Sequence, residues 1–262
     1  MNRNRPFILE IQNATVKRGE YCLLDSISLR IREGEHTAIL GPNGSGKTSL
    51  LKLITRDFYP MYSEDTVVRL FGRTAWDLFE IRKQIGVVSD SLKVFYNTGC
   101  TGEEAILSGF FGSVGLFSVH EVTAEMRQKT GEVMAFLEIT HLSGKKLAHM
   151  SSGEMSRFLV GRAIIHDPKA LILDEPTAHL DIKSAHIFLS YIEKLAEAGT
   201  TIIMVTHHVH DIIPPIRRIV MLKEGRVFMD GLKEQLLTDE RVSSLFDFPV
   251  GIKKDGPSYY FR

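Results

Sequence analysis

One glycine-rich stretch, GPNGSGKT at residues 41–48, constrains the fold of this chain more than any other feature. Gly41 and Gly46 enclose four residues, and Lys47 and Thr48 follow at once. The apolar run HTAIL (residues 36–40) precedes the stretch with strand character, and SLLKLI (residues 49–54) follows as a helix with an apolar face. A glycine loop between a strand and a helix binds phosphate in many folds, so the stretch predicts an α/β chain with a phosphate site.

The residue types in this loop suit a nucleoside triphosphate with Mg²⁺. Glycines let successive backbone N–H groups approach phosphate oxygens, and the following helix points its positive end at the same anion. Lys47 can reach the β and γ phosphates, and the Thr48 hydroxyl can ligate Mg²⁺. The spacing matches the Walker A pattern in full, and we expect nucleotide contacts from Gly41, Pro42, Asn43, Gly44, Ser45, Gly46, Lys47, Thr48 and Ser49.

Strand-like and helical patterns alternate along most of the chain. Strand character is evident over residues 8–16, 26–31, 170–173 and 201–205, and a hairpin surrounds the Lys-Glu-Gly turn at 223–225. Residues 182–198 predict a helix with an apolar stripe of Ile182, Ala185, Leu189, Ile192 and Ala196. The range 94–149 has helical spacing and no strand-like run, which predicts an inserted helical subdomain. The alternation predicts a mostly parallel sheet covered on both faces.

Two adjacent carboxylates follow a buried strand. Asp174 comes directly after four apolar residues, and Glu175 and Pro176 follow it. Ligands bind at the carboxyl edge of a parallel sheet, so Asp174 is a candidate Mg²⁺ ligand and Glu175 a candidate general base for an attacking water. An ordinary helix start would also explain such carboxylates, but it does not explain the apolar strand before them.

Composition limits the class of partner and compartment. The 32 basic residues balance 32 acidic ones, so the chain lacks the basic footprint of a nucleic-acid binder. Its two cysteines, Cys22 and Cys100, are expected to be free thiols in a reducing compartment. The N-terminus lacks the apolar segment of a signal peptide, and no apolar run is long enough to span a membrane.

Five motifs in one order identify a family resemblance: GPNGSGKT, SSGE (151–154), LILDEP (171–176), HLD (179–181) and THH (206–208). This order resembles the ATPase domain of ABC transporters over nearly the whole chain. The resemblance implies a P-loop NTPase of the ABC type, with a mostly parallel central sheet, an N-terminal antiparallel β subdomain and an inserted helical subdomain. The expected parts are a core (about 1–93 and 150–230), a helical subdomain (about 94–149) and a C-terminal tail (about 231–262) with one helix.

The resemblance also implies a composite site. In the family two ATPase domains form a head-to-tail homodimer, and each ATP lies between one Walker A loop and the partner's signature motif. Here the signature motif is residues 150–154, in which Ser151, Gly153 and Glu154 are the expected contacts. Independently of the resemblance, Ser151-x-x-Glu154 reads as a capping box that starts a helix. Asp181 would belong to the D-loop that touches the partner, and His207 would contact the γ-phosphate or the attacking water.

Three departures from the family pattern carry expectations of their own. The usual LSGGQ signature reads MSSGE, a form similar to that of molybdenum-type ATPases. The Q-loop glutamine is replaced by Asp90, or by Ser89, and we expect Asp90 to keep a role in the Mg²⁺ shell. In the family an aromatic residue stacks on adenine. Alignment puts that position at Arg18, whereas the chemistry of stacking favours Tyr21, and both residues remain candidates.

The resemblance implies the ATP-hydrolysing subunit of an importer, driven by ATP and Mg²⁺ and attached to integral membrane subunits on the cytoplasmic face of the cell membrane. Residues 109–119, with four large apolar side chains, are the candidate docking stretch. The alternative is a stand-alone ABC ATPase that acts on a cytosolic partner, which a changed Q-loop would permit. A metal site made by His207, His208 and His210 is a weaker alternative, because Zn²⁺ ligands must converge in space.

Overall fold

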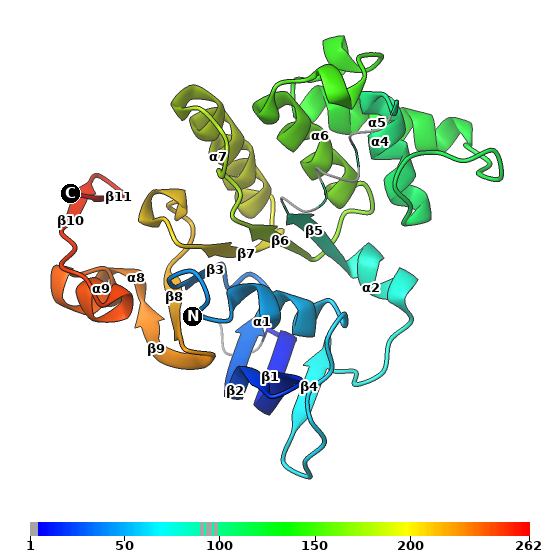
Figure 1. Ribbon diagram of the computed structural model, residues 1–262. Helices are drawn as coiled ribbons and strands as arrows, with labels where there is room; N and C mark the ends of the chain where they lie inside the picture. The colour runs from blue at the N-terminus through cyan, green and yellow to red at the C-terminus, as the bar shows by residue number, and fades with distance from the viewer. Residues whose placement is uncertain (1–4, 90–91, 93–95, 97–98) are drawn as a thin grey trace. The chain divides into compact units, whose positions relative to one another are not determined.

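The computed structural model describes residues 5–89, 92, 96 and 99–262. The chain divides into two compact units, Met1–Ile81 with Thr201–Arg262, and Arg82–Thr200. Figure 1 shows the order of the elements in each. Among the described residues, no helix is long and apolar enough to cross a membrane.

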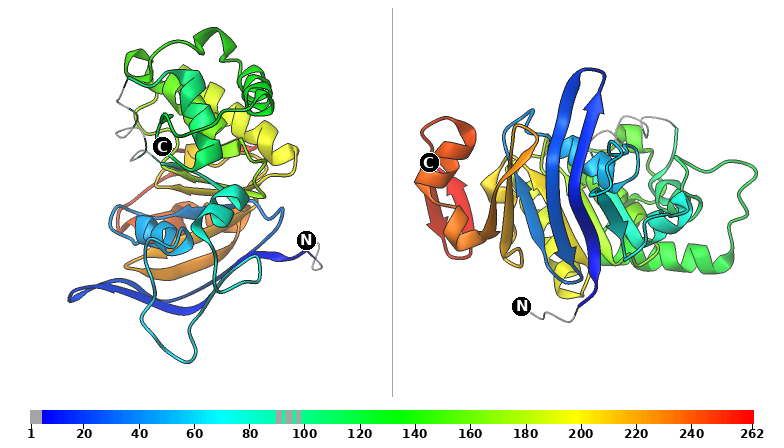
Figure 2. Two further views of the ribbon diagram at one scale, coloured as in Figure 1. Left: turned by 90° about the vertical axis from the view of Figure 1, so that its right-hand side faces the viewer. Right: turned by 90° about the horizontal axis from the view of Figure 1, so that it is seen from below.

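The first unit contains an antiparallel sheet in the order β2-β1-β4. Its strands are β1 (Phe7–Arg18), β2 (Tyr21–Arg32) and β4 (Val67–Leu70). The long ribbon of β1 and β2 is clearest in the right-hand view of Figure 2. Apolar side chains alternate along β1, where Leu9, Ile11, Ala14 and Val16 are buried. The expected N-terminal antiparallel subdomain is thereby confirmed.

The first unit also contains a mostly parallel group of strands in the order β7-β3-β8-β9. The strand β3 (Thr37–Leu40) pairs in parallel with β7 (Thr201–Thr206) and β8 (Arg218–Lys223), and β9 (Arg226–Leu232) adds an antiparallel edge. Every residue of β3 and β7 is buried, as expected for parallel strands covered on both faces. The remaining elements of the unit are α1 (Lys47–Ile54), η4 (Val209–Asp211), α8 (Lys233–Leu236), α9 (Asp239–Phe246), β10 (Ile252–Asp255) and β11 (Ser258–Phe261).

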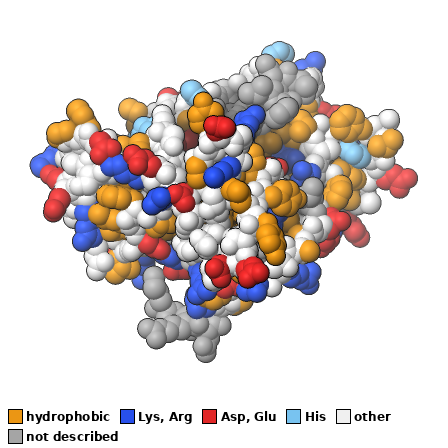
Figure 3. Space-filling model, turned by 60° about the horizontal axis from the view of Figure 1, so that its bottom comes forward, with side chains coloured by type: hydrophobic (Ala, Val, Ile, Leu, Met, Phe, Trp, Pro, Cys, Tyr) orange, Lys and Arg blue, Asp and Glu red, His pale blue; other side chains and the backbone are white. Residues whose placement is uncertain are grey.

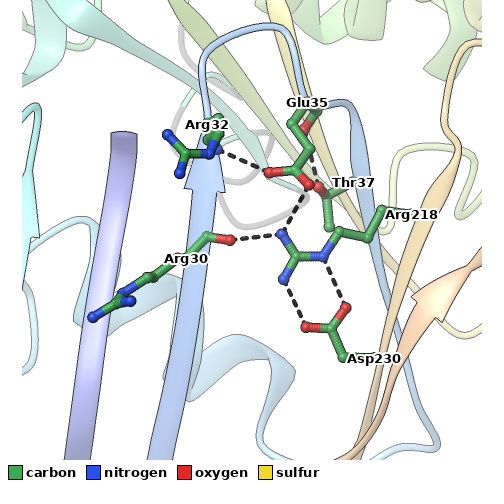
Figure 4. Close-up of polar contacts among 6 residues, drawn as sticks. All are labelled: Arg30, Arg32, Glu35, Thr37, Arg218 and Asp230. Carbon is green, nitrogen blue, oxygen red and sulfur yellow. Dashed lines mark hydrogen bonds and ion pairs between the residues drawn. The ribbon is translucent and has the colours of Figure 1, made fainter. Parts of the chain in front are cut away.

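A partly buried arginine joins the two sheets of this unit, as Figure 4 shows. Arg218 of β8 donates two hydrogen bonds to Asp230 of β9, at 2.8 and 2.6 Å, and a third to the carbonyl of Arg30 on β2, at 2.6 Å. Its guanidinium also lies 3.2 Å from a carboxylate oxygen of Glu35. Since Glu35 lies two residues before β3, this network anchors the start of the strand that leads into the glycine loop.

The second unit carries the predicted helical insert and a parallel strand pair. The strand β5 (Ile85–Ser89) pairs in parallel with β6 (Ala170–Asp174). The boundary between the two units, after Ile81, falls within helix α2 (Leu78–Gln84). The other elements are α4 (Gly102–Leu107), η1 (Ser108–Phe111), α5 (Ala124–Phe136), η2 (Thr140–Leu142), η3 (Leu147–His149), α6 (Ser152–Ile164) and α7 (Ile182–Glu197). The fold class is confirmed, while the subdomain boundaries stay a prediction.

The surface mixes charges of both signs. On the face that Figure 3 shows, acidic and basic side chains are interspersed rather than gathered by sign. Ion pairs at the surface of the protein include Lys129 with Asp167 at 2.7 Å and Lys223 with Asp247 at 2.6 Å. Such pairs contribute at most about 1 kcal/mol each, so the packed sheets and not these pairs stabilise the fold.

Candidate nucleotide site

The glycine loop, which we call the phosphate loop (residues 41–49), connects β3 to α1. Gly46 precedes the helix with φ of 101°, in the left-handed region where only glycine is relaxed. A Cβ on Gly41 would lie 2.4 Å from the carbonyl oxygen of Leu222, so that position also requires glycine. The α1 N-terminus receives no hydrogen bond from a side-chain cap. Its first N–H groups therefore suit an anion.

The side chains of the phosphate loop fit a triphosphate. Lys47 Nζ donates hydrogen bonds to the carbonyls of Gly41 and Pro42, at 2.8 and 3.1 Å, so the ammonium lies over the loop. Thr48 and Asn43 are exposed, while Ser49 is half-buried. Ser45 Oγ is buried without a hydrogen-bond partner in the described structure, which a phosphate oxygen would supply. Cationic, hydroxyl and backbone N–H donors around one concave loop are the chemistry that ATP needs.

The turn between β8 and β9 is hydrogen-bonded to the phosphate loop. Gly225 donates from its N–H to the carbonyl of Ser45, at 3.0 Å, and accepts from the N–H of Asp25, at 2.8 Å. A Cβ on Gly46 would lie 3.0 Å from the carbonyl oxygen of Leu23. The phosphate loop is thus held between this turn and the first residues of β2. The sequence suggested the hairpin but not its contact with the loop.

Both candidates for the adenine contact lie at the tip of the β1–β2 hairpin. Arg18 and Tyr21 are register partners across the hairpin, and both are exposed, Tyr21 at 79%. Directly opposed residues project to the same face of a sheet, so the two side chains are neighbours rather than exclusive choices. The carbonyl oxygen of Leu23, two residues after Tyr21, lies against Gly46, so the strand that begins at Tyr21 adjoins the phosphate loop. Both residues therefore remain candidates for the adenine contact.

His207 follows β7 at the same sheet edge as the phosphate loop. The ladder pairs Leu40 with Thr206, and the N–H of Gly41 donates to the carbonyl of Thr206 at 3.4 Å. The His207 ring lies 3.8 Å from that of His208, centroid to centroid. The structure therefore places His207 next to the start of the phosphate loop. Among the described residues, no group of three or more His, Cys, Asp or Glu is arranged to hold a metal ion.

A buried hydroxyl–carboxylate pair anchors the backbone around His207. Thr206 Oγ1 donates to Asp211, whose side chain is fully buried, and accepts from the N–H of His208 at 2.9 Å. One hydroxyl thus joins the residue before the histidine to the residue after it. Sequence patterns did not indicate this pair, because an aspartate four residues past a histidine has no distinctive spacing.

The expected metal-side carboxylates lie in the second unit. Asp174 ends β6, and Glu175 follows it with φ of 48°, a left-handed conformation that is uncommon outside glycine. Such a conformation turns the chain sharply and lifts the glutamate away from the strand direction. The parallel ladder pairs Asp174 with Ser89, the second Q-loop candidate. Asp90, the first candidate, lies outside the described residues.

The signature motif starts α6 as the capping box that the sequence predicted. Ser151 Oγ accepts from the N–H of Glu154 at 3.2 Å, and the Glu154 carboxylate accepts from the N–H of Ser151 at 2.9 Å. The Lys145 ammonium also contacts this carboxylate, at 2.8 Å, and its hydrogen bond is the main cause that lowers the pKa of Glu154. Sequence reasoning missed Lys145, which lies nine positions before its partner.

The D-loop aspartate packs close to the signature motif. Asp181 caps α7 by accepting from the N–H and the hydroxyl of Ser184, at 2.9 and 2.6 Å, and these bonds lower its pKa. A Cβ on Gly153 would lie 2.8 Å from the Ser184 side chain. Gly153 and Asp181 therefore both contact the first turn of α7. Ile182, which the predicted apolar stripe placed in the core, is 91% exposed beside Asp181.

Comparisons with known proteins agree with this geometry. The family model described as ABC transporter matches residues 24–178. The uncharacterized ABC transporter ATP-binding protein YlmA of Bacillus subtilis (strain 168) is 33% identical over 249 residues, which are 94% of this chain and 93% of that protein. The ABC transporter ATP-binding protein ModF of Escherichia coli (strain K12) is 35% identical over 220 residues, which are 79% of this chain and 42% of that protein. This match supports only loosely the prediction that the signature motif has a molybdenum-type form.

A solved structure supports the same assignment. The dimeric ATP-binding cassette MJ0796, bound to ADP and Pi in a post-hydrolysis state, superimposes with a TM-score of 0.70 at 28% identity, covering 86% of this chain and 98% of that one. The family match exceeds half of the chain, and YlmA aligns with 94% of it. The chain belongs to the ABC transporter family, as one of its ATP-binding, ATP-hydrolysing cassettes.

Proposed function

We propose that this cassette is the ATPase subunit of a transporter and that two copies close head to tail on two ATP–Mg²⁺. The ordered set of motifs on a cassette fold supports the composite site. Each half of that site is present in one chain: the phosphate loop with His207, and the signature motif with Asp181. The similarity to MJ0796, which is a dimer bound to ADP and Pi, supports a dimer of this cassette as well.

In this proposal the phosphate loop and the β1–β2 hairpin bind the nucleotide. Lys47 and the N–H groups of the α1 terminus hold the phosphates. Arg18 and Tyr21 cover the adenine face. Mg²⁺ would be ligated by Thr48 and Asp174, whose hydroxyl and carboxylate oxygens are ligands of the type it prefers. Asp90 would complete the shell, with Ser89 as the alternative.

Hydrolysis then requires a base and an orienting group. Glu175 would accept a proton from the attacking water, and since it follows Asp174 in the chain it would lie beside a metal that Asp174 ligates. His207 would hold the γ-phosphate or that water, fixed through the Thr206–Asp211 pair. From the partner copy, the Ser151 hydroxyl and the Gly153 N–H would contact the γ-phosphate at the α6 N-terminus, and Asp181 would touch the opposite subunit.

The observation that carries the transporter proposal is an apolar surface on the helical insert. Phe117 is 60% exposed and Val119 81% exposed. The loop is ordered around them, because the N–H of Phe117 donates to His120 Nδ1 at 3.2 Å and the His120 ring stacks on Phe111. Large apolar side chains fixed in water favour a protein contact. We assign this surface to a polytopic membrane subunit, on the cytoplasmic face of the cell membrane.

A stand-alone ATPase with a cytosolic partner is the second candidate, favoured by the absent Q-loop glutamine. The Glu175→Gln variant, tagged in its native cell, separates the two. Recovery in the membrane fraction with a polytopic protein supports the transporter, and the exchange of Phe117 and Val119 for alanine should release that protein. Phe248→Ala, which removes an aromatic side chain that is 68% exposed in the first unit, is the matched control. Recovery with a cytosolic protein only would contradict the transporter proposal.

A further inference from the structure

The signature motif carries an acidic residue where the family resemblance has a neutral glutamine. Glu154 is the third residue of α6 and lies in the same first turn as Gly153, three residues after the Ser151 cap. A carboxylate at a helix N-terminus stabilises the helix, but the same negative charge repels an anion that approaches that terminus. Under the proposed function the approaching anion is the γ-phosphate of the ATP held by the partner. The negative charge of Glu154 should therefore weaken the binding of this γ-phosphate, whereas a neutral glutamine would not.

Lys145 lies where it can cancel this charge. Its ammonium is 2.8 Å from the Glu154 carboxylate, and both side chains are partly exposed, at 36% and 23%. The same carboxylate oxygen accepts from the N–H of Ser151, so the glutamate folds back over the N-terminus of its own helix. The Lys145 hydrogen bond lowers the pKa of Glu154 and so favours the ionised carboxylate, whose negative charge the ammonium at 2.8 Å offsets.

The backbone holds Lys145 in this place. Its N–H donates to the carbonyl of Leu142 at 3.0 Å, and its carbonyl accepts from the N–H of Gly102 at 3.0 Å. The next residue, Lys146, pairs with Thr101 in an isolated β-bridge, while its side chain is exposed. The Lys145 backbone is thus fixed beside the first residue of α4, which limits the entropy lost when the ammonium meets Glu154. Lys146 offers the same charge without the contact.

We propose that Lys145 is the charge-compensating residue of the signature motif, which neutralises Glu154 so that the α6 N-terminus accepts the partner's γ-phosphate. This inference rests on the head-to-tail dimer of the proposed function. Lys145 touches neither reacting atom, and it acts through Glu154 on the field at the helix terminus. The pair as a unit then presents the same net charge as the neutral glutamine.

The test measures ATP-driven dimerisation in a Glu175→Gln background, by sedimentation velocity at saturating ATP–Mg²⁺. Lys145→Met, which keeps the apolar stem, should raise the dimer dissociation constant about tenfold, since both sites of a dimer gain an unpaired negative charge. Lys145→Met with Glu154→Gln should return the constant to within about twofold of the parent. Lys146→Met should leave it unchanged. A fluorescent ATP analogue should bind the monomeric form of every variant equally.

Two results would overturn the charge compensation alone. A Lys145→Met protein that dimerises like its parent would show that the charge of Glu154 does not affect dimerisation. A double variant as weak as Lys145→Met would show that the lysine is needed for structure and not for charge. A parent that stays monomeric in saturating ATP–Mg²⁺ overturns the composite site as well, so the two failures are distinguishable.

Discussion

The phosphate loop and the signature motif would bind the same nucleotide from opposite sides, but they are held in different ways. The phosphate loop depends on backbone geometry, with Gly46 left-handed at φ of 101° and Gly41 pressed against the Leu222 carbonyl. The signature motif depends on side chains, with Ser151, Glu154 and Lys145 in one hydrogen-bonded group. A backbone-held loop does not accept a side chain at Gly41 or Gly46, whereas a group of side chains can accept changes that compensate one another. This difference explains why GPNGSGKT matches its family pattern in full and MSSGE does not.

The largest effect should come from a methyl group in the phosphate loop. Gly46→Ala forces a Cβ into a left-handed position against Leu23, at a cost of about 1–3 kcal/mol. Since displaced N–H groups lose charge-assisted hydrogen bonds to phosphate, we expect ATP affinity to fall about 100-fold. Titration with a fluorescent ATP analogue measures this. Gly131→Ala, in helix α5 with open space around the new Cβ, is the control, and it should bind ATP normally and gain up to about 1 kcal/mol.

A smaller effect should follow from loosening His207 while the phosphate loop stays intact. Thr206→Val removes the hydroxyl that bonds Asp211 and accepts from the N–H of His208. We expect kcat to fall about tenfold with ATP affinity unchanged, because positioning and not binding is lost. Thr206→Ser keeps the hydroxyl and should restore kcat. Equal losses in both variants would mean that the threonine methyl packing, and not the hydroxyl, holds the histidine.

The smallest effect concerns the stability of the signature motif. Lys145 lowers the pKa of Glu154 below its ordinary value of 4.5. A carboxyl with a depressed folded pKa stabilises the protein above its unfolded pKa, and that contribution disappears as the pH falls through the folded pKa. Because the pair is partly exposed, Glu154→Gln should cost less than about 1 kcal/mol at pH 7. Urea titrations should show the difference from wild type vanishing below pH 4.5. A difference that persists in acid would assign it to packing.

The same contrast explains how far the sequence predicted the structure. The phosphate loop, the strands around it and the capping box at Ser151 were predictable, because each depends on residues close together in the chain. Their chemistry is local, so a one-dimensional pattern contains it. The family resemblance then supplied the order of the remaining motifs, and the fold class was confirmed.

Contacts between distant residues were not predictable in this way. Lys145 with Glu154, and Arg218 with Glu35 and Asp230, join separate elements that no periodicity relates. The helix at 182–197 was predicted, but its buried face consists of Phe188, Tyr191, Ile192, Leu195 and Ala196, so the stripe that included Ile182 was wrong in part. A helix near a partner surface can expose an isoleucine, which hydrophobic periodicity assigns to the core.

The sequence predicted the structure of the C-terminal segment least well. The sequence indicated one helix and a tail, whereas the structure has two helices and the β10–β11 hairpin, which packs against η4 just after His207. The hairpin strands have four residues each, β10 contains two lysines and an aspartate, and Tyr259 of β11 is the buried side chain. Short strands stabilised by one aromatic side chain leave little pattern for a sequence to show.

The mass of the Glu175→Gln protein in saturating ATP–Mg²⁺ tests the composite site most directly. Without the proposed base, ATP should stay bound, and light scattering should report a dimer that dissociates when Mg²⁺ is chelated. Lys47→Ala added to the same protein should abolish the dimer, because the phosphate loop then binds ATP poorly. A Glu175→Gln protein that binds ATP and remains a monomer at all concentrations would contradict the account.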